Sequence, residues 1–242
     1  MNPGLLLATT ARVLRQLAGD HRTIALVLVL PCLILGLIAW MFDGTPVLNE
    51  FGPVAVGIFP LIVMFLVTSV ATLRERTSGT LERLMTTPLG RGDFVIGYAL
   101  AFGALALVQA GVVTAFAIAV GMDVKGSVGL LAGVAVLNAV LGSSLGLAGS
   151  SLARTEFQAV QLMPAFLFPQ IIVCGLLMPR DQMPQALEWI SRVLPLTYAV
   201  EAMQKIAHGA SWSDVAGAVG VMALWLVAAM AIGSLTLRRR TP

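Results

Sequence analysis

The stretch Arg74-Glu75-Arg76-Thr77-Ser78-Gly79-Thr80-Leu81-Glu82-Arg83-Leu84-Met85-Thr86-Thr87-Pro88-Leu89 is a dense charge cluster between two long apolar runs, Phe51–Leu73 and Phe94–Met122. A short polar loop is enough to reverse a chain between two membrane spans, whereas this segment is as long as a helix. The sequence therefore predicts an all-α membrane protein that keeps a structured segment in the loop after its second span.

Composition and charge-free windows also indicate a polytopic membrane protein. Of all residues, 58% are hydrophobic and 11% are charged, against about 25% charged in a soluble domain. Six windows without Asp, Glu, Lys or Arg are each long enough for the roughly 20 residues of a spanning helix. These windows are Thr23–Phe42, Phe51–Leu73, Phe94–Met122, Gly126–Ala153, Phe157–Pro179 and Val215–Leu237. No linker divides them, so we expect residues 1–242 to form one transmembrane domain.

The distribution of Lys and Arg predicts the orientation. If six spans alternate, eleven basic residues lie on the side of both termini, and four lie on the other side. Because cytoplasmic loops carry the excess of basic residues, we expect both termini in the cytoplasm. No basic groove with interleaved aromatic residues accompanies this bias, so nucleic acid is not an expected partner.

The charged loop carries the signals of a docking helix over Thr77–Leu89. Thr77 or Ser78 can cap its start, and Pro88 ends it. An apolar stripe at helical spacing consists of Leu81, Leu84 and Met85. Arg and Glu alternate on the exposed face, which suits a protein partner. A solvated or interfacial helix is the alternative interpretation.

Residues 1–22 predict a second helix outside the spans. The apolar residues Leu6, Val13, Leu14 and Leu17 fall on one helical face, with Arg12 and Arg15 turned elsewhere. This pattern is typical of an amphipathic helix in the membrane interface. An extension of the first span is the alternative.

Span four is rich in small residues and is expected to pack among other helices. Its two small-xxx-small pairs are Gly129 with Gly133 and Gly142 with Gly146. Asn138, and Gln109 in span three, are the polar side chains deepest in the membrane. Hydrogen bonds to neighbouring helices are the preferred interpretation, and lining a substrate path is the alternative.

After Pro179 the chain is not span-like again until Val215. Met183–Val193 and Leu196–His208 are short amphipathic stretches punctuated by prolines. We therefore expect two short extracellular re-entrant helices within residues 180–213, at or dipping into the outer membrane surface.

Motifs for chemistry on this chain are absent from the sequence. Residues 142–146 match G-x-S-x-G, but the two histidines, His21 and His208, lie outside the spans, so an intramembrane serine hydrolase is not expected. Neither lysine follows a glycine, which excludes a P-loop. No carboxylate lies deep in a span, as a proton-driven transporter would need. We therefore expect a chain that is no enzyme and takes its energy from a partner.

Two motifs resemble the integral-membrane subunit of ABC-2-type transporters, in particular bacterial drug and lipid export permeases of the daunorubicin-exporter kind. The first is residues 74–84 followed by Thr87-Pro88-Leu89. The second is Pro179, Met183-Pro184 and residues 190–198. With the six spans, these motifs cover nearly the whole chain.

The resemblance implies partners. Two such subunits, identical or homologous, would sit on a dimer of separate cytoplasmic ATPase subunits, which hold ATP and Mg, while this chain holds no cofactor. Thr77–Leu89, within the loop 74–92, resembles the coupling helix, and residues 1–22 resemble the interfacial connecting helix. The residues implied in ATPase coupling are Glu75, Arg76, Gly79, Thr80, Leu81, Glu82, Leu84 and Met85.

The resemblance also implies a path and a gate. Spans one, two and five line the path in the family, and here they offer Trp40, Phe59, Met64, Phe65, Thr68, Phe166, Phe168 and Gln170. The implied extracellular gate contains Met183, Pro184, Pro195 and Tyr198. Such a lining favours a lipophilic or amphipathic cargo. Plain lipid-facing surface is the alternative role for these Phe and Met residues.

The expected function is ATP-driven export of drugs or lipids by alternating access, in a bacterial plasma membrane. Export of lipid-linked polysaccharide is the nearest alternative, and it ranks second because the chain has two tyrosines, Tyr98 and Tyr198. A sensor or immunity complex without net transport and a passive channel are further alternatives.

Overall fold

Helices make up all the regular secondary structure of residues 3–78, 91–176 and 178–235, which this computed structural model describes. They are α1 (Pro3–Gly19), α2 (His21–Met41), α3 (Val47–Thr77), α5 (Arg91–Ala119), α6 (Val128–Gly149), α7 (Glu156–Val173), the 3-10 helix η1 (Arg180–Gln182), α8 (Gln185–Val193), α9 (Pro195–Ala207) and α10 (Trp212–Leu235). Six of them, α2, α3, α5, α6, α7 and α10, are long and apolar enough to cross a membrane. The predicted all-α fold with six spans is therefore confirmed.

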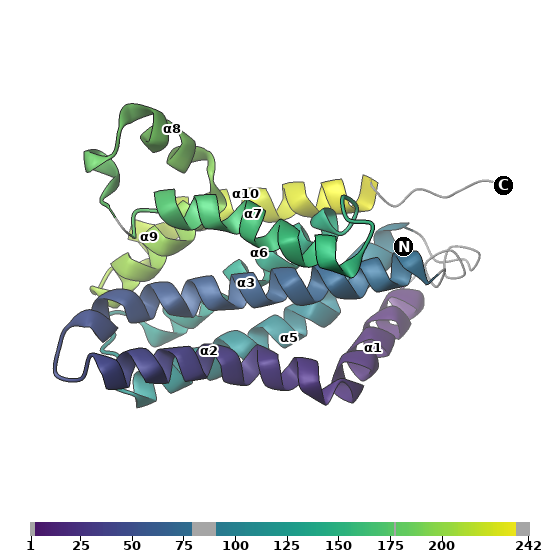
Figure 1. Cartoon of the computed structure of the whole chain (residues 1–242), viewed down its shortest axis with the longest axis horizontal. Coiled ribbons are helices and arrows are strands. Elements are labelled where there is room, and N and C mark those ends of the chain that lie inside the picture. The colour runs from purple at the N-terminus through teal and green to yellow at the C-terminus, as the bar shows by residue number, and fades with distance from the viewer. Residues whose placement is uncertain (1–2, 79–90, 177, 236–242) are drawn as a thin grey trace.

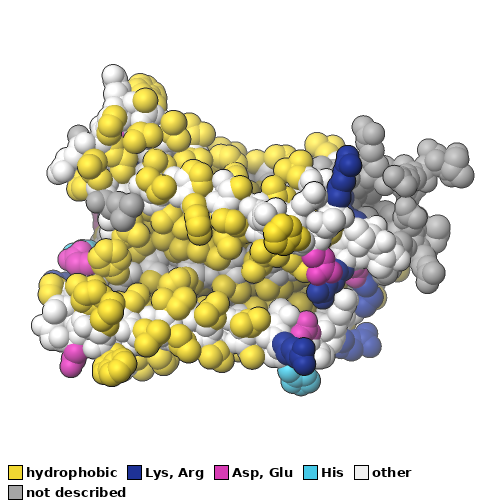
Figure 2. Space-filling view, in the orientation of Figure 1, with side chains coloured by type: hydrophobic (Ala, Val, Ile, Leu, Met, Phe, Trp, Pro, Cys, Tyr) yellow, Lys and Arg dark blue, Asp and Glu magenta, His cyan; other side chains and the backbone are white. Residues whose placement is uncertain are grey.

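The spanning helices run along the long axis of the molecule, as Figure 1 shows. The C-terminal end of α3, the helix α1 and the end of α10 lie at one end, which we call the basic end. At the opposite end α8 stands away from the bundle. Figure 2 shows hydrophobic side chains over the middle of one face, with its Lys and Arg side chains gathered mainly towards the basic end.

Helices α3 and α6 pack with their backbones in direct contact. A Cβ atom added to Gly142 would lie 2.4 Å from the carbonyl oxygen of Leu61, and one added to Gly146 would lie 2.4 Å from that of Phe65. Only glycine fits at such backbone contacts. The predicted role of this small-residue pair in helix packing is therefore confirmed.

The other pair, Gly129 and Gly133, does not pack in this chain. Both glycines are exposed, and a Cβ added to Gly133 would meet no atom within 4 Å. The two pairs are thirteen residues apart in α6, which turns them about 220° from each other around the helix axis. The expectation that both pairs pack inside the chain was wrong for Gly129 and Gly133, because spacing alone does not give the direction of a face.

The two deep polar side chains join helices, as predicted. Asn138 Nδ2 of α6 donates to the carbonyl oxygen of Gly57 in α3 at 2.8 Å. Gln109 Nε2 of α5 donates to that of Val27 in α2 at 3.1 Å. Both side chains are fully buried. These bonds fix neighbouring helices against each other, which confirms the packing interpretation.

The helices do not begin and end at the boundaries of the charge-free windows where a capping residue sets the boundary. Asp20 begins α2 by accepting hydrogen bonds from the backbone N–H and the hydroxyl of Thr23, at 3.1 and 2.7 Å. These bonds lower the pKa of Asp20. Because Asp20 separates them, α1 and α2 are two helices rather than one long first span. By contrast, α3 continues through Arg74–Thr77, so the first residues of the expected loop are helical.

The region after η1 contains the two predicted short helices, at different depths. On α8, Trp189, Ile190 and Val193 are exposed. By contrast, α9 packs against α3, α6 and α10, and its Met203 and Ile206 are fully buried. The second helix is therefore part of the core. The C-terminal residue of α8 is bonded to α10, because Trp225 Nε1 donates to the Val193 carbonyl at 2.9 Å.

Candidate coupling site at the basic end

Three helices meet in a buried polar cluster at the basic end. Arg12 of α1 donates from Nη1 to Glu75 Oε1 at 2.8 Å and from Nη2 to Glu75 Oε2 at 3.3 Å. The same Nη2 donates to Tyr98 Oη of α5 at 3.0 Å. Since Glu75 lies in the last turn of α3, the Arg12–Glu75–Tyr98 cluster ties α1, α3 and α5 together.

Glu75 and Tyr98 are buried and Arg12 is half-buried, so the charged groups of the cluster depend on one another for stabilisation. Glu75 is 5% exposed and Tyr98 is 2% exposed, and the Tyr98 ring packs beside Phe102 with centroids 5.9 Å apart. Burial alone lowers the pKa of Arg12, but the hydrogen bond and charge of Glu75 outweigh it and raise that pKa. A bidentate pair between Arg and a carboxylate fixes orientation as well as distance. The cluster is therefore a rigid joint between the three helices.

A second ion pair lies at the surface beside the cluster. Arg74 of α3 donates from Nε and Nη2 to the two carboxylate oxygens of Glu156 in α7, at 2.7 and 3.0 Å. Both side chains are more than half exposed. Exposed pairs contribute about 0–1 kcal/mol, so this contact orients α7 more than it stabilises the fold.

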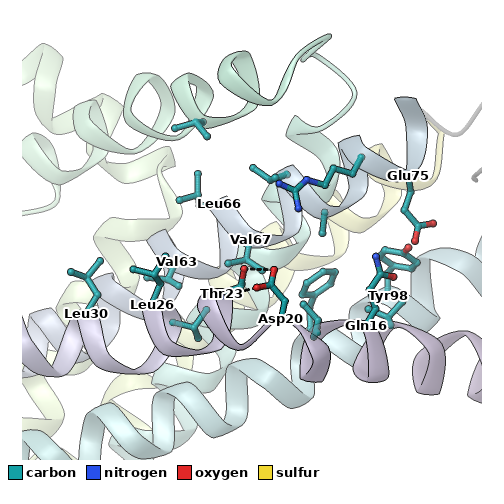
Figure 3. Close-up of a pocket in the computed structure, with 18 residues that line it drawn as sticks. Gln16, Asp20, Thr23, Leu26, Leu30, Val63, Leu66, Val67, Glu75 and Tyr98 are labelled. Atoms are coloured by element: carbon teal, nitrogen blue, oxygen red, sulfur yellow. Dashed lines mark hydrogen bonds between the residues drawn. The ribbon is translucent and has the colours of Figure 1, made fainter. Parts of the chain in front are cut away.

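A cavity of about 350 Å³ lies next to the cluster, between α1, α2, α3 and α5. Figure 3 shows Gln16, Glu75 and Tyr98 at one end of it and Leu30, Leu26 and Val63 at the other, with Asp20 and Thr23 between. The cavity is thus apolar over most of its length and polar towards the basic end. This division is typical of sites that hold small amphipathic molecules.

The structure places two of the residues implied in coupling. Glu75 and Arg76 lie in the last turn of α3, and Glu75 faces α1 and α5 rather than the surface. Gly79, Thr80, Leu81, Glu82, Leu84 and Met85, with the rest of the expected Thr77–Leu89 helix beyond Ser78, lie outside the described residues. Their coupling role stays a prediction.

Sequence reasoning missed the partners of Glu75. Arg12 was predicted to lie on the polar face of an amphipathic helix, and Tyr98 was mentioned only as one of two tyrosines in the chain. Their separations from Glu75 in the sequence match no helical or strand period. The available signal was the combination of Arg12 in the N-terminal segment with Tyr98, the one tyrosine in the apolar window Phe94–Met122.

The residues implied in a translocation path divide into two groups. Met64, Phe65, Thr68 and Gln170 are buried within this chain, and Phe59 is half-buried. Trp40, Phe166 and Phe168 are exposed. Phe65 and Phe166 stack with centroids 6.3 Å apart, so this contact joins α3 to α7. The exposed residues of the set thus lie at the surface of this chain, and the path role of the whole set stays a prediction.

The residues implied in a gate lie at the ends of the short helices. Met183 and Pro184 flank the turn between η1 and α8, and Pro195 begins α9. Tyr198 Oη donates to the carbonyl oxygen of Arg192 at 2.6 Å, which holds α8 and α9 together. The gate role of these residues stays a prediction.

The described ranges hold no cluster of potential metal ligands. No group of three or more His, Cys, Asp or Glu side chains there is placed to hold a metal ion. Cys32 and Cys174 are free thiols. The described part of the site consists of charged and polar side chains that connect helices at the C-terminal end of α3.

Comparisons with known proteins agree with this arrangement. Residues 4–208 match the family model described as ABC-2 type transporter. The chain is 32% identical over 178 residues to ABC transporter G family member 20 of Dictyostelium discoideum, covering 72% of this chain and 24% of that protein. It is 30% identical over 155 residues to the probable multidrug ABC transporter permease YbhR of Escherichia coli, covering 64% and 42%.

A third relative is the linearmycin resistance permease protein LnrN of Bacillus subtilis, 26% identical over 190 residues, with 76% of this chain and 49% of that protein covered. The chain thus spans between about a quarter and a half of the length of these relatives. The family model covers α1 to α9, including the residues of the coupling site that the structure describes. This chain belongs to the ABC-2 type transporter family.

Proposed function

We propose that this chain is the membrane-spanning permease subunit of an ATP-driven exporter that moves lipophilic or amphipathic compounds out of the bacterial cell. The main support for this proposal is that residues 4–208 match the ABC-2 type transporter family and that the described chain has six helices able to cross a membrane. Two relatives, a probable multidrug permease and a linearmycin resistance permease, favour drug-like cargo over polysaccharide.

The energy would come from a dimer of ATPase subunits that holds ATP and Mg, docked at the basic end. Residues 79–90 follow α3 directly, and the Arg12–Glu75–Tyr98 cluster joins the end of α3 to α1 and α5. A displacement of residues 79–90 would therefore reach three helices through bonds of fixed geometry. In this proposal Glu82 and its neighbours contact the ATPase, while Glu75 transmits the displacement inside the chain.

The transport path would form between two permease subunits, identical or homologous, in alternating access. Exposed apolar side chains on α2 and α7, such as Trp40 and Phe168, support a path lined from these helices. The basic end would face the cytoplasm, because Lys and Arg side chains gather there (Figure 2). Both termini would then be cytoplasmic, and α8 and α9 extracellular.

Purification of the assembled complex tests this function. The affinity-tagged chain is solubilised in a gentle detergent, co-eluting proteins are identified, and the complex is reconstituted in vesicles with a fluorescent lipophilic dye. We expect a stoichiometric ATPase and ATP-dependent movement of the dye. Absence of any ATPase, or dye movement without ATP, would refute the proposal in favour of a channel or a sensor.

Charge reversal tests the coupling assignment. Glu82→Lys is expected to keep expression and ATP hydrolysis but to abolish dye movement, because it reverses charge on the docking segment. Asp43→Lys makes the same charge change in the turn between α2 and α3, at the opposite end, and serves as the control. Normal transport by the Glu82→Lys complex would remove Glu82 from the coupling surface.

A further inference from the structure

The cavity beside the coupling site carries an unbalanced negative charge. Three charged side chains line it: Asp20, Arg74 and Glu75. Glu75 is paired with Arg12, and Arg74 is paired with Glu156. In the described ranges Asp20 forms no ion pair within 4.0 Å, and its side chain accepts hydrogen bonds from Thr23. These bonds lower the pKa of Asp20 and the charge of Arg74 helps to lower it, but Arg74 bonds directly to Glu156. The charge that remains for a ligand is therefore that of the Asp20 carboxylate.

Asp20 keeps acceptor capacity beyond its capping role. Each carboxylate oxygen accepts one hydrogen bond from Thr23, at 3.1 Å from the backbone N–H and at 2.7 Å from the hydroxyl. A carboxylate offers about four acceptor sites, so each oxygen can accept a further donor. In Figure 3, Asp20 lies between the polar end of the cavity and its aliphatic end.

The aliphatic end of the cavity is open to the outside of the bundle. Leu26 and Leu30 of α2 line the cavity and are also 62% and 44% exposed. Both belong to a helix that is long and apolar enough to cross a membrane. Lipid would therefore contact the mouth of the cavity, and a molecule already dissolved in the membrane could enter it sideways. The polar end would lie near the membrane surface at the basic end.

We propose that this cavity binds lipophilic ammonium compounds, with the cationic head on Asp20 and the hydrocarbon body between Leu26, Leu30 and Val67. This inference rests on the proposed function and specifies its substrate class. The volume of about 350 Å³ lies within the usual range for small-molecule sites, and a single carboxylate without an ion-pair partner, placed next to the aliphatic end, selects single-headed cationic amphipaths. An anionic head would be repelled by the Asp20 carboxylate, because the other two lining charges, Glu75 and Arg74, are already paired with Arg12 and Glu156.

Direct binding tests the proposal. The complex, purified with its partners and placed in lipid nanodiscs, is titrated with tritiated dodecylammonium, and scintillation proximity is measured against empty nanodiscs. Dodecanol and laurate provide the neutral and anionic probes with the same chain length. The variant is Asp20→Asn, which keeps a residue of equal capping strength and removes the charge. Asp43→Asn, the same change in the turn after α2, is the matched control.

We expect saturable binding of dodecylammonium that Asp20→Asn weakens about tenfold and Asp43→Asn leaves unchanged, as loss of a charge-assisted hydrogen bond requires. Dodecanol binding should not respond to Asp20→Asn. A second variant, Val67→Phe, fills the cavity and should weaken both probes. Elution volume in size-exclusion chromatography verifies that each variant is folded.

Three results would overturn the proposal: equal affinity for dodecylammonium and dodecanol with no effect of Asp20→Asn, preferential binding of laurate, or no saturable binding by the wild-type complex. The proposed function fails separately. If Asp20→Asn left dye export unchanged, the proposed function would be retained and this binding site rejected. If dodecylammonium bound but no ATP-dependent export occurred, the binding site would be retained and the proposed function rejected.

Discussion

Substitution of Gly142 by alanine is the sharpest test of how the bundle is packed. The added Cβ would lie 2.4 Å from the Leu61 carbonyl oxygen, 2.9 Å from its Cα and 3.0 Å from its carbonyl carbon, whereas ordinary van der Waals contact begins at 3.4 Å. All three atoms are backbone, so no side-chain rotation relieves the contact. Helix α6 must instead move away from α3.

The cost follows from that displacement. Overpacking of a close contact typically destabilises by about 1–3 kcal/mol, and this one lies between the most extensively packed helices of the chain. The displacement also strains the bond from Asn138 Nδ2 to the Gly57 carbonyl, which is 2.8 Å long. With about 2–4 °C per kcal/mol for a chain of this size, we expect the apparent melting temperature to fall by about 2–12 °C.

The assay is thermal unfolding in detergent, followed by fluorescence-detected size-exclusion chromatography at one heating rate. Gly133→Ala is the control on the same helix, since its Cβ would meet no atom within 4 Å and alanine favours a helix over glycine. We expect that variant to melt at the wild-type temperature or slightly above it. Equal melting of Gly142→Ala and Gly133→Ala would refute the packing of α6 on α3.

Three further substitutions separate strong contacts from weak ones by the same assay. Glu75→Gln leaves the mostly buried Arg12 without its counter-charge and should cost about 1–3 kcal/mol; unchanged melting would mean that the cluster is not a joint. Arg74→Gln breaks an exposed pair and should cost under about 1 kcal/mol at any salt concentration, so a large loss would contradict its surface position. Asn138→Ala removes the donor to Gly57 and should cost about 1–2 kcal/mol, while no loss would show that the bond is not stabilising.

Much of the fold could be predicted because spanning helices depend on local composition. The first window, Thr23–Phe42, agrees closely with α2, His21–Met41. The second window failed at its ends because it was bounded by charges, and charges do not end a helix: α3 begins at Val47 and continues through Thr77. Capping by Asp20 and Thr155 sets boundaries where the side chain can accept a backbone N–H.

The site was less predictable because it depends on contacts between distant segments. Glu75 was identified from a local motif, but its partners are distant in the sequence. Arg12 lies 63 residues before Glu75, and Tyr98 lies in α5. The amphipathic pattern of α9 gave its apolar face correctly, yet that pattern does not distinguish a helix on a membrane surface from one packed into a core. Only the arrangement of α3, α6 and α10 around it decides that question.

The positions of the prolines in α3 have a mechanical consequence. Pro53 and Pro60 lie in the first half of this 31-residue helix, and each leaves a backbone carbonyl without its usual donor, which makes a helix easier to bend there. The half from Leu61 to Thr77 contains no proline and measures about 25 Å. It is also the half that contacts Gly142 and Gly146 through its backbone.

If α3 bends at its prolines, this half would carry the adjoining part of α6 with it, because their backbones are in direct contact at Gly142 and Gly146. A rotation of about 10° at Pro60 would carry the Thr77 end through about 4 Å, given the rise per residue of an α-helix. Such a stroke would keep the contacts at Gly142 and Gly146, whereas the hydrogen bond from Asn138 of α6 to Gly57 lies on the other side of Pro60 and would have to adjust. The deformation would be confined to the proline-containing half, where Gly57 packs against Met203 of α9.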